Sequence, residues 1–71
     1  MNQPKNIVEA FELVDKMNQD SWTFELFSSE YGGFSAKFEC GCGARGRYTA
    51  NEDTAVEAIY TAASLAAKAY P

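Results

Sequence analysis

The first quarter of the chain carries apolar side chains at the spacing of an amphipathic helix. These positions lie three and four residues apart and fall on one face: Ile7, Ala10, Phe11, Val14 and Met17. Asn6 precedes them and Glu9 follows three residues later, which is typical of a capping box at a helix N-terminus. The pattern therefore predicts a helix over about residues 7–17.

The middle of the chain alternates between apolar and polar positions, which is the period of a β-strand. Three such runs cover about residues 22–28, 34–40 and 44–49. Segments that contain glycine, 28–33 and 41–43, separate the runs. Because short turns join neighbouring antiparallel strands, the sequence predicts a three-stranded antiparallel meander.

The last third of the chain predicts a second helix over about residues 52–69. Asn51 is the predicted N-cap. Glu52 and Asp53 place acids in the first turn and Lys68 places a base in the last, as the helix dipole favours. The apolar arc of this helix is wide and rich in alanine. We therefore expect it to lie close against the sheet and to touch either the first helix or a second subunit.

These elements make a single α+β domain over residues 1–71, in which two helices flank the meander in the order αβββα. The order resembles the double-stranded RNA-binding domain over nearly the whole chain. Two glycines and an alanine pattern carry the resemblance: Gly43, Gly46, Ala55, Ala58, Ala62 and Ala63. The resemblance implies that the helices and the sheet pack together as they do in that family. It does not extend to RNA binding, because the family uses lysines at the start of the second helix and a histidine between the first two strands. Here Glu52 and Asp53 stand at that helix start, and the chain has no histidine.

Charge narrows the classes of partner. Ten acids against six bases give a net charge of −4, which disfavours direct nucleic-acid binding and binding to an anionic membrane. Two groups of acids could flank one surface if the helices pack side by side: Glu9, Glu12 and Asp15 on the first helix, and Glu52, Asp53 and Glu57 on the second. Such a surface suits a basic groove on another protein, while capping and solubility explain the same acids without a partner.

Three aromatic residues are candidates for an exposed anchor at an interface. Tyr31 lies in the predicted turn between the first two strands, Phe27 on the outer side of the first strand, and Tyr60 at the edge of the second helix. In so small a domain, the same residues could instead seal the rim of the core.

The pair Cys40 and Cys42 is the most distinctive short motif. Two cysteines beside glycines resemble half of a zinc site, which a symmetric dimer could complete, but the chain supplies only two of the four ligands. A bond between residues two apart would be reducible. We expect reduced thiols, with Cys40 facing the core and Cys42 in the turn. Arg45 and Arg47 follow, and both are expected on the open face of the third strand among solvated ion pairs.

No residue set for catalysis is present: the chain offers no histidine, no phosphate-binding glycine loop and no cluster of metal ligands. The sequence therefore predicts a non-enzymatic protein without a cofactor. We expect it in the cytoplasm, because residues 1–5 lead into an amphipathic stretch and not into the apolar segment of a signal peptide. Its function would be that of an inhibitor or adaptor that binds a larger protein with a basic surface. In size and acidity it resembles the small anti-defence proteins of phages, anti-CRISPR inhibitors included. The alternative is a homodimeric interaction module, linked through Cys40 and Cys42 or through the apolar face of the second helix.

Overall fold

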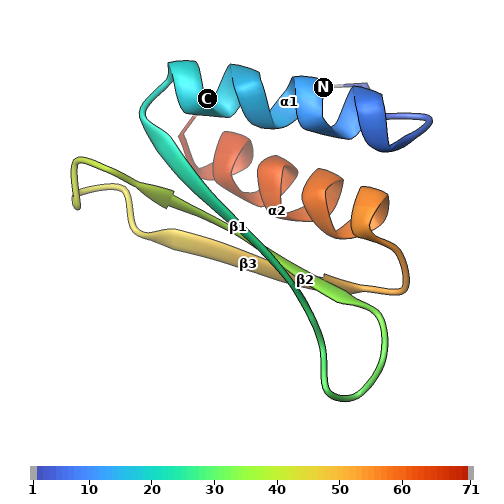
Figure 1. Ribbon diagram of the computed structural model, residues 1–71. Coiled ribbons are helices and arrows are strands. Elements are labelled where there is room, and N and C mark those ends of the chain that lie inside the picture. The colour runs from blue at the N-terminus through green and yellow to red at the C-terminus, as the bar shows by residue number, and fades with distance from the viewer. Residues whose placement is uncertain (1, 71) are drawn as a thin grey trace.

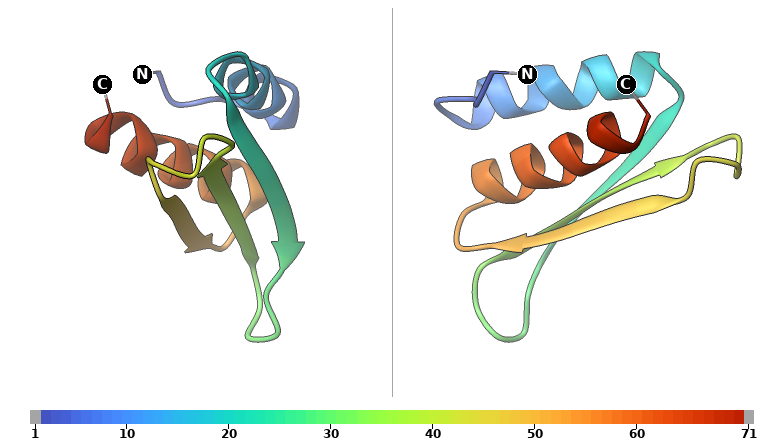
Figure 2. Two further views of the ribbon diagram at one scale, coloured as in Figure 1. Left: turned by 90° about the vertical axis from the view of Figure 1, so that its left-hand side faces the viewer. Right: turned by 180° about the vertical axis from the view of Figure 1, so that it is seen from behind.

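The computed structural model of the protein describes residues 2–70 and shows the predicted α+β fold. Its elements follow in the order α1 (Ile7–Gln19), β1 (Trp22–Ser28), β2 (Phe34–Cys40), β3 (Arg47–Glu52) and α2 (Ala55–Ala69). The strands form one antiparallel sheet in the order β1-β2-β3, and both helices lie on one side of it (Figures 1 and 2). The predicted domain covers residues 1–71, and its two end residues, Met1 and Pro71, lie outside the described part of the chain.

Helix α1 begins as the capping pattern predicts and runs two residues beyond the predicted end. The side chain of Asn6 accepts a hydrogen bond from the backbone N–H of Glu9 at 2.9 Å. The Glu9 carboxylate in turn accepts from the backbone N–H of Lys5, also at 2.9 Å. These bonds satisfy N–H groups that a helix start leaves without an intrahelical partner.

The predicted start of the second helix was wrong by three residues, because β3 extends further than expected. Asn51 and Glu52 belong to β3 and pair with Ser35 and Phe34 of β2. The N-cap of α2 is therefore Thr54, whose hydroxyl accepts from the N–H of Glu57 at 3.1 Å. Backbone pairing across the sheet provides partners for these N–H and C=O groups, which outweighs the capping preference of asparagine.

The third strand also starts three residues later than predicted. Gly43 and Gly46 both adopt positive φ angles, of 75° and 79°, so the chain turns over residues 41–46 instead of pairing. Arg45 therefore lies in this turn and not on the open face of the sheet, where the sequence had placed it. The first two strands, by contrast, have the predicted bounds.

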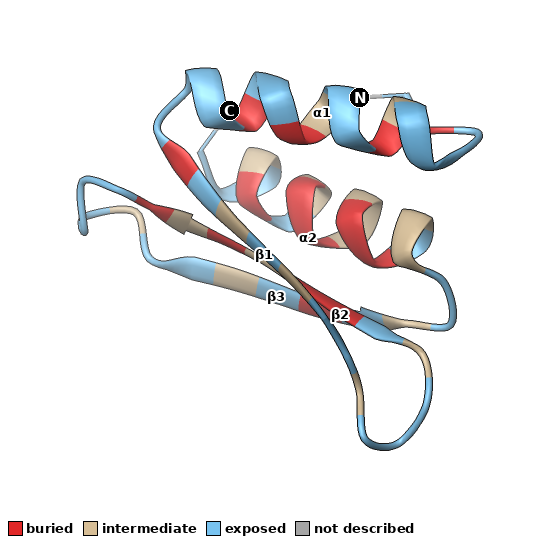
Figure 3. Ribbon diagram, viewed as in Figure 1, coloured by how far each residue is buried: buried red, intermediate tan, exposed pale blue. Residues whose placement is uncertain are grey.

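The hydrophobic core lies between the sheet and the two helices (Figure 3). Phe38 of β2 and Ile59 of α2 are its largest fully buried side chains. The buried face of α2 is otherwise alanine, at Ala58, Ala62, Ala63 and Ala66. These small side chains let α2 approach β2 and β3 closely, while α1 packs on β1 and α2. The wide apolar arc of the second helix is thus covered largely within the molecule, and the predicted contact with the first helix is confirmed.

Candidate functional site

The hairpin between β1 and β2 projects beyond the rest of the sheet (Figures 1 and 2). Its turn is closed by hydrogen bonds from Ser29 N–H to the carbonyl of Gly33 and from Gly32 N–H to the carbonyl of Ser29, both at 3.1 Å. Tyr31 lies in this turn, and its backbone N–H donates to the Ser29 hydroxyl at 3.2 Å. The Tyr31 side chain is 91% exposed, so the fold gains little from it. Its predicted exposure is confirmed.

Gly33 lets the hairpin approach the junction of β3 and α2 closely, because it has no Cβ. It has a φ of 77°, and a Cβ at this position would overlap the carbonyl oxygen of Glu52 and lie 3.3 Å from the Cα of Asp53. Only glycine adopts this conformation at such a close approach without strain. Tyr31 therefore lies near Glu52 and Asp53, two of the predicted acids, although these are 21 and 22 positions further along the chain.

Two adjoining hollows surround Tyr31. One is lined by Tyr31, Ser29, Asn51, Glu52 and Asp53, and the other extends from Tyr31 to Glu30, Phe27 and the buried Ser35. The Ser35 hydroxyl donates to the side chain of Asn51, so this buried polar group is satisfied. We call the exposed residues Phe27, Glu30, Tyr31 and Asp53, together with the half-buried Glu52, the hairpin-end surface. The described residues that line its hollows include three acids, Glu30, Glu52 and Asp53, and no base.

Three of the six predicted acids make hydrogen bonds within the domain, and the other three do not. Glu52 accepts a hydrogen bond from the Thr61 hydroxyl at 2.7 Å, and Glu57 accepts one from the Thr54 hydroxyl at 2.9 Å. Glu9 takes part in the cap of α1. The other three predicted acids are Glu12, Asp15 and Asp53. Their side chains are exposed and make no hydrogen bond or ion pair with the described part of the chain.

The acids of α1 do not join the hairpin-end surface. Glu9 and Glu12 line a separate hollow together with Pro4 and Lys16, whereas Glu52 and Asp53 lie beside Tyr31. Tyr60 is half-buried on α2 and lines neither hollow at the hairpin end. A partner role for the α1 acids and Tyr60 stays a prediction. The combination that the structure assembles is Tyr31 with Glu52 and Asp53.

The open face of the sheet is polar and internally paired. Lys37 of β2 lies 3.4 Å from the carboxylate of Glu25 on β1 and 3.8 Å from that of Glu39. Arg47 of β3 stands opposite Glu39 in the strand register. These are solvent-accessible pairs, each worth about 1 kcal/mol or less. The sheet face therefore carries ion pairs, but Lys37 forms them, whereas Arg45 lies in the turn and Arg47 has no ion pair with the described residues.

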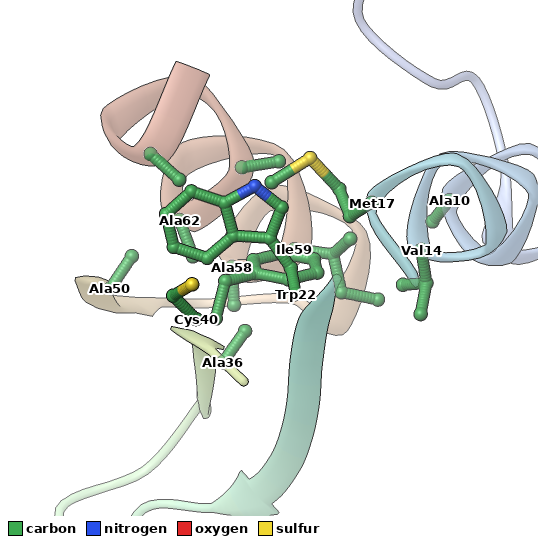
Figure 4. Packing of buried hydrophobic residues seen from close by; sticks show 13 residues of the cluster. Ala10, Val14, Met17, Trp22, Ala36, Cys40, Ala50, Ala58, Ile59 and Ala62 are labelled. Atoms are coloured by element: carbon green, nitrogen blue, oxygen red, sulfur yellow. The ribbon is translucent and has the colours of Figure 1, made fainter. Parts of the chain in front are cut away.

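At the other end of β2, Cys40 and Cys42 form a disulfide, so the expectation of reduced thiols was wrong for this structure. Their predicted positions are confirmed. Cys40 is buried beside Trp22 (Figure 4), and Cys42 is exposed in the turn. Within residues 2–70 no group of three or more His, Cys, Asp or Glu side chains could hold a metal ion. The half-site for zinc therefore gains no further ligand from the described part of this chain.

Arg45 binds this disulfide turn to the turn between α1 and β1. Its guanidinium lies over the ring of Trp22, 4.3 Å from the centroid, and Nε donates to Cys40 Sγ at 3.1 Å. The remaining nitrogens donate to the backbone carbonyl of Asp20 at 2.6 Å and to its carboxylate at 3.2 Å. The sequence reasoning missed this contact. The proximity of arginine to the two cysteines in the sequence was the one available signal.

Among the described residues, no helix has the length and apolar character needed to span a membrane. Neither a family model, nor a curated protein, nor a solved structure matches the chain. The element order αβββα and the antiparallel sheet are compatible with the double-stranded RNA-binding domain, and no comparison adds support for that family.

Proposed function

We propose that this domain is a non-enzymatic protein-binding module whose hairpin-end surface docks on a basic site of a larger protein. The observation that carries the proposal is the position of Tyr31. This side chain is 91% exposed and lines a hollow together with Glu52 and Asp53. Tyrosine is enriched among residues that dominate binding energy, because it buries a large rigid area and also offers a hydroxyl.

Charge indicates the chemistry of the partner. Glu30, Glu52 and Asp53 line the hollows at the hairpin end, and none of the described residues that line them is basic. The whole chain has a net charge of −4. A basic surface would complement these carboxylates and accelerate association. Phe27, which is 48% exposed, adds apolar area beside Tyr31. We take the encounter to be cytoplasmic, as the sequence predicted.

Occlusion of a nucleic-acid-binding site is the form of this function that we favour. Sites that grip phosphates are rich in lysine and arginine, so carboxylates around an aromatic anchor can occupy the same positions. Some of the small anti-defence proteins of phages, which the chain resembles in size and acidity, act in this way. The proposal requires no cofactor and no catalytic group.

The test begins with proteins that the tagged domain retains from a host lysate, identified by mass and then purified. Calorimetry with each purified partner compares Tyr31→Ala and Asp53→Lys with Asp15→Lys. The last variant reverses another exposed acid, on α1, and changes the net charge by the same amount. We expect Tyr31→Ala to weaken binding about 30-fold, in the range of an interface hot spot. Asp53→Lys should weaken binding more than Asp15→Lys does.

The retained protein should also lose its nucleic-acid binding when the domain is added. Unchanged affinity in Tyr31→Ala and Asp53→Lys would overturn the hairpin-end surface as the binding site. Recovery of the domain alone, as a stable dimer, would favour the homodimeric alternative.

A further inference from the structure

The turn that contains Cys40 and Cys42 has a chemistry that the proposed binding function does not use. The two sulfurs differ in their surroundings: Cys40 is 4% exposed and packs beside Trp22, whereas Cys42 is exposed in the turn. An external thiolate can therefore approach the sulfur of Cys42, while the core shields the sulfur of Cys40. A disulfide with one accessible and one shielded sulfur favours attack on the accessible sulfur.

Cys40 Sγ is surrounded by hydrogen-bond donors. Arg45 Nε donates to it at 3.1 Å, and the backbone N–H of Cys42 donates at 3.1 Å. A positive guanidinium and an N–H group stabilise negative charge on sulfur, so Cys40 would leave readily as a thiolate when the bond is cleaved. The sulfur of Cys42 accepts a single, longer bond, from the N–H of Ala44 at 3.4 Å. The shielded sulfur of Cys40 thus accepts more and shorter hydrogen bonds than the sulfur of the exposed Cys42.

Arg45 is held in this position by groups other than the disulfide. Its contacts with the Trp22 ring, with the backbone carbonyl of Asp20 and with the Asp20 carboxylate involve no sulfur atom. A hydrogen bond from Gly41 N–H to the carbonyl of Ser21, at 2.8 Å, fixes the turn to the same neighbouring segment. The donors should therefore stay in place after the sulfur–sulfur bond is broken.

A bond between residues two apart also adds little to the stability of the fold. The entropy that a disulfide removes from the unfolded chain grows with the length of the loop that it closes, and this loop is very short. The core, with Phe38 and Ile59 fully buried, is assembled from the sheet and both helices. The fold should therefore persist when Cys40 and Cys42 are reduced.

We propose that Cys40 and Cys42 form a reversible dithiol–disulfide site that exchanges with low-molecular-weight thiols, with Arg45 stabilising Cys40 as the leaving thiolate. A first external thiolate attacks Cys42 Sγ, which forms a mixed disulfide and releases Cys40 as a thiolate. A second external thiolate attacks the external sulfur of the mixed disulfide, which releases Cys42. Two external thiols are oxidised to one disulfide, and their two electrons reduce the protein pair. The reverse reaction uses the disulfide of the same small thiol.

A hollow beside Cys42 offers space for the incoming thiol. It is lined by Cys42, Gly41, Ser21, Trp22, Thr23, Phe24 and Asn18. Ser21, Thr23 and Asn18 thus add polar residues to the hollow that Cys42 shares with two aromatic rings. This chemistry suits a small polar thiol such as glutathione, which is the probe for the experiment.

The first experiment equilibrates the protein with mixtures of reduced and oxidised glutathione. After an acid quench and alkylation of free thiols, mass determination gives the fraction in each state, and far-ultraviolet circular dichroism follows the helices. We expect full interconversion with unchanged helix content. A bond that millimolar reduced glutathione does not open, or a chain that unfolds on reduction, would overturn the proposal in favour of a structural brace.

The second experiment tests the role of Arg45 through the rate of reduction by glutathione, again measured by mass. Arg45→Gln removes the donor to Cys40, whereas Arg47→Gln removes the same charge from an exposed residue of β3. We expect a reduction rate about tenfold lower in Arg45→Gln, as the loss of a charge-assisted bond implies, and an unchanged rate in Arg47→Gln. Equal rates in the two variants would show that Arg45 has no part in the exchange.

A third measurement does not depend on how well Arg45→Gln folds. The variants Cys40→Ser and Cys42→Ser each keep one cysteine and are exposed to oxidised glutathione. Cys42 should form the glutathione adduct in the first variant much faster than Cys40 does in the second, because Cys40 is only 4% exposed. Faster adduct formation at Cys40 would contradict the assignment of the attacked sulfur.

Discussion

Substitution of Gly33 by alanine should destabilise this domain by about 2–5 kcal/mol, as the sum of two effects. Gly33 has a φ of 77°, and this left-handed conformation costs an L-residue about 1–2 kcal/mol. The new Cβ would also overlap the carbonyl oxygen of Glu52 and lie 3.2 Å from its carbonyl carbon. Forcing atoms into an occupied space costs about 1–3 kcal/mol more. The neighbouring atoms are backbone atoms, so no flexible side chain can move aside.

Gly32→Ala is the matched control, because its φ of 94° is also positive but no atom lies within 4 Å of the added Cβ. Both substitutions restrict the unfolded chain in the same way. The difference between them therefore isolates the contact with Glu52, for which we expect about 1–3 kcal/mol. Urea unfolding, followed through the fluorescence of the single tryptophan, Trp22, measures both free energies. Equal midpoints for the two variants would refute the close approach of the hairpin to the junction of β3 and α2.

Three further substitutions test other parts of the fold. Ser21 is the one described non-glycine residue with a positive φ, of 67°, so Ser21→Gly should raise the free energy of unfolding by about 0.5–1 kcal/mol, and a lower melting temperature would contradict this. Thr54→Ala should cost about 1 kcal/mol in urea unfolding through loss of the α2 cap, while Thr54→Ser, which keeps the hydroxyl, should cost far less. Phe38→Ala should cost about 3–5 kcal/mol, which is comparable to the total stability of so small a domain. Its thermal transition by circular dichroism should therefore lose cooperativity, and a melting curve like that of the parent would disprove the central position of this side chain.

The order of the elements was predictable because hydrophobic periodicity reports directly which side chains face the core. Ala36, Phe38 and Cys40 alternate with polar neighbours, and all three are buried against the helices. Ala10, Val14 and Met17 likewise lie on the buried side of α1, whereas Ile7 and Phe11 of the same predicted face are exposed. Burial of apolar area is the dominant favourable term in folding, so a pattern that supports only one buried face specifies that face.

The boundaries at the second helix were less predictable because local and long-range preferences compete there. Asn51 is a good helix cap on its own, but its backbone pairs with Ser35, which lies 16 residues earlier. Thr54 then takes the cap. A local sequence pattern does not report pairing with a distant strand, so the predicted helix start was too early.

The arrangement of residues at the candidate sites depends still more on contacts between distant parts of the chain. Exposure of Tyr31 followed from its position in a turn, but its place beside Glu52 and Asp53 depends on how closely Gly33 packs against the end of β3. The contact of Arg45 with Asp20 joins residues that are 25 positions apart. Such partners become visible only once the strands are in register.

The two proposals concern opposite ends of the same strand, which makes them separable by experiment. In the register of β1 and β2, Trp22 pairs with Cys40 at one end, and Ser28 pairs with Phe34 at the other. Six residue steps along β2 place these ends roughly 20 Å apart, at about 3.3 Å per step. Effects at sites this far apart are usually additive. Reduction of the disulfide should therefore leave partner binding through Tyr31 unchanged, and Tyr31→Ala should leave the glutathione equilibrium unchanged. Because the two sites act independently, the loss of one activity in a variant would leave the other measurable in the same protein.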